Sequence, residues 1–405
     1  MSTRPALRQG RGVAPGREPG RSKPTLVCAS RPAAGRRIRV IVSALLAALA
    51  VAASGCTGHP AAPGASDPAV LRAQAVVAAA LKTTGDYRGP LSGPPAQRPG
   101  LIVFVAADLT DGGIAGVAEG VAQAARAIGW PLRILDGQGT VQGQGAALRL
   151  ALTLKPAGII LGGVDAAGQQ AALAQARAQG IPVAGWHAAV RPGPDPKAGL
   201  FTNVTTNPAE VALLAASYVI AHSDGTAGVV ILTDSGYAIE AYKAGQLAST
   251  LKKCRRCSVL QVVDAPIANA QTDDPAAVDA LLESYGKRLT YLLAVNGAYI
   301  TGARVALFGA GVPGDEPPFS VAAGDGDASE LERIRVGNYQ LATVAEPLYL
   351  QGWQLIDELN RARAGQPPSG YVAPPHLITQ ADVPSGAVFD PPSGYRQNYL
   401  RIWHR

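Results

Sequence analysis

The feature that most constrains this chain is a regular alternation of short apolar strands and amphipathic helices, which runs through the chain twice. Each strand segment is a run of consecutive apolar residues, such as LIVFVA at 101–106, a pattern typical of strands buried inside a parallel sheet. The first series contains strands at 101–106, 131–135, 158–161 and 182–186 and helices at 114–129, 144–154 and 166–180. Such alternation predicts a right-handed, doubly wound parallel sheet.

The alternation starts again after a break near residues 201–207. The second series contains helices at 208–222, 239–253, 274–285, 297–308, 329–335 and 350–364 and strands at 227–233, 259–263, 291–295, 319–323 and 342–344. We therefore expect an α/β protein with two Rossmann-like lobes. Because ligands of open α/β sheets bind beyond the carboxyl ends of the strands, two facing sheets would share one cleft.

The positive charge of the chain is concentrated at its N-terminus. Residues 1–55 hold ten basic residues and one acid, whereas the remainder holds 26 basic and 28 acidic residues. The net charge of +7 therefore belongs to this leader and gives no argument for a nucleic-acid partner, which we do not expect.

Residues 1–55 are predicted to be a signal peptide. A basic stretch precedes an apolar run at 40–53, which is too short to span a bilayer as a helix but suits the apolar region of a signal sequence. It ends in Ala-Ser-Gly before Cys56, which resembles a lipobox and implies cleavage before Cys56 and a lipid on its thiol. A plain secretion signal is the alternative. Residues 56–100 would then form the lipid anchor, a tether, a short helix at 68–82 and a Pro/Gly-rich linker.

Cys254 and Cys257 form a C-x-x-C pair between a predicted helix and strand. Such a pair occurs in redox motifs and as half of a zinc site, but no second Cys or His pair stands at zinc spacing. A structural disulfide suits an exported protein, and thiol chemistry is the alternative.

Several longer segments resemble the type I periplasmic binding proteins, in the sugar-binding branch that serves ABC importers. They are VFVAADLTDGG, KPAGIILGGVDAAGQQAALAQARAQGIPVAGWH, AVNGAYITGA, AAGDGDASELERIRVGNYQLATVAEPLYLQGWQLIDELN and PPHLIT. The resemblance covers roughly residues 101–380. It implies a first lobe of residues 101–203 plus 347–375 and a second of 204–346 plus 376–405. A hinge of three crossings would lie near Asn203, Glu346 and residues 375–380.

The resemblance also implies ligand contacts, with departures at several positions. Asn296 matches an Asn that contacts ligand hydroxyls, and Asp325 matches the Asp of a Gly-rich turn. Glu346 stands where a Gln often lies at the hinge. Trp186 and His187 replace the usual Asp-Arg pair.

Two further departures affect the expected chemistry of the cleft. Asp111 stands where the family has an Asn followed by aromatic residues, and Tyr242 lies near the place of an Arg. With Trp186, the two tyrosines Tyr237 and Tyr242 would supply aromatic faces, while the carboxylates and Asn296 would bind hydroxyls. The bland alternatives are that the acids and Asn296 only cap helices and turns, and that the aromatic residues only pack in the core.

The expected function is that of an extracytoplasmic solute-binding lipoprotein, anchored to the cell membrane and monomeric. It would bind a sugar or polyol-like ligand and deliver it to an ABC permease. A receptor that presents a ligand to a membrane signalling partner is the alternative. The chain lacks G-x-S-x-G, H-E-x-x-H and Walker A motifs, so we expect no enzyme activity, cofactor or metal.

Overall fold

The computed structural model describes residues 67–82 and 87–405. The predicted signal peptide, Cys56 and the tether lie outside the described residues. Within the described ranges, no helix has both the length and the apolar character needed to cross a membrane.

The first sheet has six strands in the order β2-β1-β3-β4-β6-β5. Its strands are β1 (Ile102–Ala106), β2 (Leu132–Asp136), β3 (Gly158–Gly162), β4 (Val183–Trp186), β5 (Gly193–Asp195) and β6 (Leu200–Val204). Its helices are α2 (Gly112–Ile128), α3 (Val141–Thr153), the short 3₁₀ turn η1 (Ala166–Gln169), α4 (Gln170–Ala178) and α10 (Leu348–Arg363). All neighbouring strands are parallel except β5, which runs antiparallel to β6.

The second sheet also has six strands, in the order β12-β11-β10-β9-β7-β8. Its strands are β7 (Gly228–Thr233), β8 (Ser258–Asp264), β9 (Tyr291–Ala294), β10 (Phe319–Ala322), β11 (Gln340–Ala345) and β12 (His376–Thr379). Its helices are α5 (Pro208–His222), α6 (Ala238–Leu251), α7 (Ala270–Tyr285), α8 (Ala298–Gly309) and α9 (Ala328–Arg335), with 3₁₀ turns η2 (Ile267–Asn269) and η3 (Gly286–Arg288). Only β12 is antiparallel to its neighbour. The expected fold class of two doubly wound α/β lobes is confirmed.

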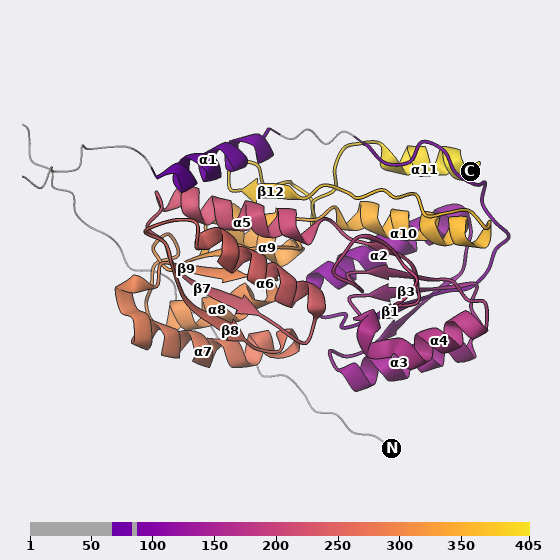
Figure 1. Ribbon diagram of the computed structural model, residues 1–405, viewed down its shortest axis with the longest axis horizontal. Coiled ribbons are helices and arrows are strands. Elements are labelled where there is room, and N and C mark those ends of the chain that lie inside the picture. The colour runs from indigo at the N-terminus through magenta and orange to yellow at the C-terminus, as the bar shows by residue number, and fades with distance from the viewer. Residues whose placement is uncertain (1–66, 83–86) are drawn as a thin grey trace, which may run out of the picture. The chain divides into compact units, whose positions relative to one another are not determined.

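Right-handed crossovers explain how helices cover both faces of each sheet. In the first sheet, the connection from β1 to β2 runs opposite to that from β2 to β3, so α2 and α3 lie on opposite faces. Helix α10 packs beside α2, and α3 beside α4 (Figure 1). Helix α2 ends where Gly129 adopts φ 84°, a left-handed conformation that glycine adopts without a Cβ clash.

The C-terminal tail departs from the expected lobe boundaries. Strand β12 joins the second sheet as expected, but α11 (Tyr395–Trp403) packs beside α10 in the core of the first lobe (Figure 1). The placement of all of 376–405 in the second lobe is therefore wrong, because Tyr399 and Trp403 of α11 stack on Trp353 of α10 and Tyr395 meets it edge to face. The chain thus crosses between the lobes again after β12, in addition to the three expected hinge segments.

The segment before the first strand is bound to both lobes. Helix α1 (Pro68–Ala80), capped by Asp67, packs on α5 of the second lobe (Figure 1). The expected linker at 87–100 lies against α10, where Asn360 accepts from the Gln97 amide at 2.9 Å and donates to the Pro94 carbonyl at 3.0 Å. This stretch is therefore part of the folded body, because α10 supplies partners for its backbone.

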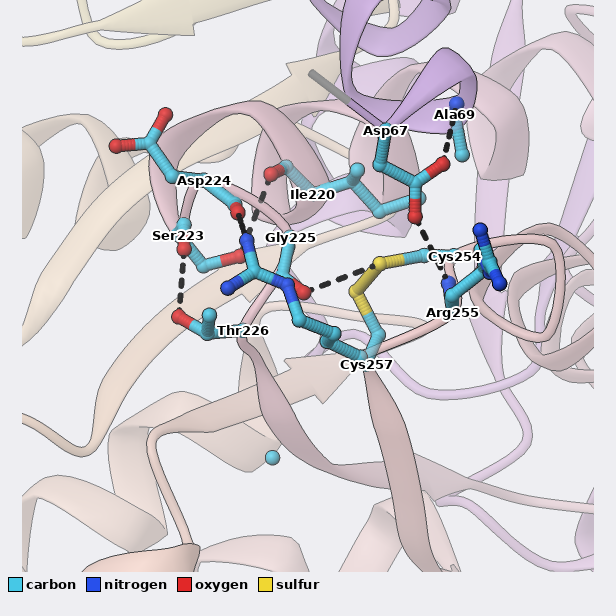
Figure 2. The surroundings of a disulfide bond; sticks show 12 residues. Asp67, Ala69, Ile220, Ser223, Asp224, Gly225, Thr226, Cys254, Arg255 and Cys257 are labelled. Carbon is cyan, nitrogen blue, oxygen red and sulfur yellow. Dashed lines mark hydrogen bonds between the residues drawn. A yellow bond between two sulfur atoms is a disulfide. The ribbon is translucent and has the colours of Figure 1, made fainter. Parts of the chain in front are cut away.

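A disulfide joins Cys254 and Cys257 in the turn between α6 and β8, with the two Cα atoms 5.3 Å apart. Figure 2 shows that this turn also holds the start of α1, because the backbone amide of Arg255 donates to Asp67 Oδ2 at 3.2 Å. Arg256 donates to the backbone carbonyl of Asp224 at 2.8 Å. The cross-link therefore lies at the amino-terminal edge of the second sheet, away from the strand ends that face the first lobe.

Candidate functional site

A cavity of about 270 Å³ lies between the two lobes, at the carboxyl ends of both sheets. This is where ligands bind in open α/β folds. Its walls come from the loops after strands β1 to β4 on one side and after β7 to β10 on the other. The lining residues are Asp108, Thr110, Asp111, Ile114, Gly139, Gly163, Trp186, His187, Tyr237, Ile239, Glu240, Ile267, Ala268, Gln271, Thr272, Asn296, Ala298 and Asp325.

Two carboxylates from opposite lobes share one amide in this cavity. Asp111 caps α2 in the first lobe, with Oδ1 accepting from the Ile114 amide at 2.9 Å. Asn296, which follows β9 in the second lobe, donates from Nδ2 to Asp111 Oδ2 at 3.0 Å and to Asp325 Oδ2 at 2.9 Å. The oxygen Oδ1 of Asn296 accepts from the Ala298 amide at 2.8 Å, so this side chain also caps the start of α8. The turn role and the cavity role therefore coexist in the same residues.

Closure of the lobes shifts the pKa values of both carboxyl groups upward. Burial raises the pKa of Asp111 to about 6, and the neighbouring charge of Asp327 adds to the rise. Burial also raises the pKa of Asp325 well above its usual range, with the charge of Asp111 as the next cause. Asp325 is 4% exposed, and its Oδ1 has no hydrogen-bond partner among the described residues. The closed cavity thus contains a buried acceptor that no described residue satisfies.

The positive charge of the site is Lys243, which the sequence argument missed. Its ammonium donates to the carbonyls of Val295 at 2.8 Å and Ala323 at 3.1 Å, and lies 3.1 Å from Glu240 Oε2. Burial opposes the charge, but the carboxylates of Glu240, Asp325 and Glu346 outweigh it and raise the pKa of Lys243. Glu240 and Lys243 lie three residues apart among the apolar positions of α6. Two charged residues on the apolar face of a helix were the sequence signal that could have identified this buried ion pair.

Tyr242 does not belong to the site. Its side chain is 38% exposed on the outer surface of α6, and it does not line the cavity. At 100° per residue, the neighbouring position 243 faces the strand ends while position 242 faces outward. The aromatic contact expected of Tyr242 is therefore not part of the cavity, and the adjacent Lys243 is the residue that α6 buries at the strand ends.

Trp186 and His187 form the wall of the cavity nearest the hinge. Their rings stack at 3.8 Å, with an interplanar angle of 9°. Trp186 is 1% exposed and donates from Nε1 to Gln351 Oε1 at 2.8 Å, so it serves the core and the cavity wall at once. His187 adopts φ 53° after β4, and its Nε2 lies 3.0 Å from Glu346 Oε1.

Glu346 is a hinge residue rather than part of the cavity lining. Its Oε2 accepts from Gln351 Nε2 at 2.8 Å and from the Thr206 amide at 3.3 Å. Burial alone would raise the pKa of Glu346, but His187, Gln351 and Lys243 together hold it at about 2. Because both oxygens are engaged and Glu346 does not line the cavity, it positions the hinge and does not face a ligand directly.

Other polar contacts link the two lobes around the cavity. Gln144 Nε2 of the first lobe donates to the hydroxyl of Tyr237 at 3.2 Å, and the Ala238 amide of the second donates to Asp165 Oδ2 at 3.2 Å. Tyr237 also lines the cavity, and its aromatic ring packs against the core of the first lobe. The structure is therefore of a closed form.

One group of described residues brings metal-ligating atoms together. Atoms of His187, Asp325 and Glu346 all lie within 4.8 Å of one another. Lys243 already supplies a positive charge beside the two carboxylates, and the Glu346 oxygens are occupied by protein donors. The donor set therefore does not require an ion.

Solved structures with the same fold cover most of this chain. A sugar ABC transporter protein from Yersinia enterocolitica matches with a TM-score of 0.64 at 19% identity, over 76% of this chain and 96% of that one. A solute-binding protein of an ABC transporter from Bacillus halodurans, with bound myo-inositol, matches with a TM-score of 0.60 at 17% identity, over 72% and 97%. A glucose-galactose binding protein from Geobacillus stearothermophilus matches with a TM-score of 0.62 at 17% identity, over 71% and 100%.

A search of curated protein sequences found no significant match. The family model described as a periplasmic binding protein domain matches residues 102–367, which include the strands and helices that form the cavity. This family consists of binding proteins and not of enzymes. The two lobes, the cavity at their strand ends and this match together show that the chain belongs to the periplasmic binding protein family.

Proposed function

We propose that this protein is an extracytoplasmic solute-binding lipoprotein of an ABC importer, which closes two lobes over a sugar or polyol-like ligand. The observation that carries the proposal is the cavity between the lobes, whose polar groups come from both of them. Two of the proteins with a similar fold support a polyhydroxylated ligand. One was solved with bound myo-inositol, and the other is described as a glucose-galactose binding protein.

The mechanism follows from where the binding groups lie. Asp111 belongs to the first lobe, whereas Asn296, Asp325 and Tyr237 belong to the second. A ligand that contacts both sets binds the closed form better than the open form, and this difference shifts the population toward closure. The closed outline is then what the permease distinguishes from the open receptor.

The cavity can bind a ring of hydroxylated carbons on two kinds of surface. Carboxylate and amide groups accept from and donate to hydroxyls, and a buried site of this kind discriminates against analogues that leave its groups unpaired. Trp186, Ile114 and Ile239 form an apolar wall suited to C–H surface. His187 completes the wall at the hinge. Asp325, Asn296 and Asp111 are therefore the proposed polar contacts.

The test is a thermal-shift and calorimetry screen of residues 57–405 against pentoses, hexoses, linear polyols and inositols. A ligand at about 100 times its Kd adds about 2.7 kcal/mol to stability. We expect at least one such ligand to bind, Asp325→Ala to weaken it strongly, and Tyr242→Ala to leave it unchanged. Equal loss in both variants, or a hit that Asp325→Ala does not affect, would remove this cavity from the proposal.

The lipid anchor requires a separate measurement. We propose that Cys56 is the first residue of the mature protein and carries the lipid, as the small residues before it suggest. Mass spectrometry of the membrane-extracted protein should find diacylglycerol on Cys56, and Cys56→Ser should release the protein from the membrane fraction. Release of an unlipidated wild-type protein into the medium would instead support a plain secretion signal.

A further inference from the structure

The cavity is lined by more carboxylates than positively charged donors. Asn296 directs its amide group to Asp111 and Asp325, and the hydroxyl of Thr110 donates to Asp108 at 2.7 Å. These two donors are thus already used within the protein, whereas the amide of Gln271 and the hydroxyl of Tyr237 can still donate to a neutral group of the ligand. The nearest ammonium, that of Lys243, also donates to backbone carbonyls and does not line the cavity.

A buried hydrogen-bonding group that stays unused among the described residues is an acceptor, a carboxylate oxygen of Asp325. Four carboxylates line the cavity (Asp108, Asp111, Glu240 and Asp325), and none of the described lining residues is an arginine or lysine. Asp325 lines the cavity, and its Oδ1 is buried and has no hydrogen-bond partner among the described residues. A buried unsatisfied acceptor costs free energy unless the ligand supplies a donor.

We propose that the ligand is a polyhydroxylated amine, such as an amino sugar or an aminocyclitol, whose protonated nitrogen binds between Asp325 and Asp111. This inference rests on the proposed function and narrows its ligand class. An ammonium group offers N–H donors and no acceptor, whereas a hydroxyl offers one donor and turns its lone pairs toward the carboxylates. Hydrogen bonds between charged partners are also the stronger ones.

The electrostatics of closure support the same ligand. Closing the lobes brings Asp111 against Asp325, and the charged groups that face Asp325 are Asp111, Lys243, Glu346 and Glu240. The titratable ring of His187 also lies beside it, within 4.8 Å of an oxygen of Asp325. Three of the four charged groups are acids, so the closed cavity favours uptake of a proton, which agrees with the raised pKa values of both aspartates. An ammonium group would replace that proton. A neutral ligand should therefore bind better below about pH 6, and a cationic ligand better above it.

The experiment is calorimetry of residues 57–405 with ligand pairs that differ by one functional group. Suitable pairs are glucose with glucosamine, sorbitol with glucamine, and myo-inositol with an inosamine. At pH 7.5 we expect the amine of at least one pair to bind about tenfold tighter or more, the factor that one charge-assisted hydrogen bond supplies. N-acetylation of that amine, which removes the charge, should abolish the gain without any change to the protein.

A protein variant gives the second arm of the test. Asp325→Asn keeps the shape of the side chain and removes its charge, so the amine should lose its affinity advantage over its neutral partner, whatever the variant does to the affinity of the neutral partner itself. Asp224→Asn is the matched control, because Asp224 is exposed at the opposite edge of the sheet (Figure 2). Tighter binding of the neutral member in each pair would overturn this inference and leave the proposed function standing. Failure of both members in every pair would count against both.

Discussion

The clearest test of the electrostatic organisation is Lys243→Met. The side chain of Lys243 is 1% exposed, and its ammonium contacts two backbone carbonyls and Glu240. Methionine fills a similar volume but provides neither the charge nor the donors. Glu240 then loses its ion-pair partner, and Asp325 loses the cation that lowers its pKa.

The expected loss of unfolding free energy follows from the carboxylates that stay buried without a cation. Removing one partner of a buried ion pair typically costs about 3–5 kcal/mol, because the other charge is left uncompensated. Protonation of the raised-pKa carboxyl groups relieves part of this cost, so we expect about 3 kcal/mol at pH 7. At about 2.1 cal/mol/K of unfolding entropy per residue, a folded body of about 340 residues loses about 1.4 °C of Tm per kcal/mol, which gives a fall of about 4 °C.

The assay is urea and thermal unfolding of residues 57–405, with Lys252→Met as the exposed control. A carboxyl group whose folded pKa is raised destabilises the fold as pH rises through that pKa, since the folded state binds more protons. Loss of Lys243 raises the pKa of Asp325 further, so the loss of stability in Lys243→Met should be smaller at acidic pH than at pH 7. A Lys243→Met protein within about 0.5 kcal/mol of wild type at pH 7, or a deficit independent of pH, would refute the reasoning.

Three further predictions concern closure, the hinge and the cross-link. Because the pKa of Asp111 rises to about 6 in the closed form, small-angle scattering of the ligand-free protein should show more closed molecules at pH 5.5 than at pH 7.5, and Asp111→Asn should remove this difference. Glu346→Gln should lower stability at pH 7 by about 1.5–3 kcal/mol through the weakened bond to His187, and the deficit in urea unfolding should narrow from about pH 4.5 toward pH 2, where the native carboxylate itself protonates. Replacing Cys254 and Cys257 by serine should cost about 2 kcal/mol or less, since the closed loop is short, and limited proteolysis should then cut the start of α1 faster than in wild type.

The local pattern of apolar and polar residues predicted most of the helices and strands, because burial and backbone geometry decide which residue types stand at each position. Helix α5 occupies Pro208–His222, the range expected from its N-terminal proline and apolar content. The buried strands β1, β3 and β7 are runs of apolar residues, as parallel strands covered on both faces must be.

The elements that were missed are short or lie in the tail. Strands β5 and β12 have three and four residues, too few for a clear alternation. Strand β6 lies in the segment interpreted as a break between the lobes. In α11, Tyr395, Tyr399 and Trp403 recur every four residues, and this helical spacing was the signal available for it.

The sequence by itself determined the two α/β lobes and placed Asp111, Asn296 and Asp325 at strand ends, because these depend on local periodicity and turn chemistry. Only the tertiary structure decided which of these groups meet. Asp111 and Asn296 are 185 residues apart and touch only because the lobes close. The orientation of α6 about its axis buries Lys243 and leaves Tyr242 exposed. At the hinge, Glu346 contacts His187. Contacts of this kind depend on how separate elements pack, and no local pattern records that packing.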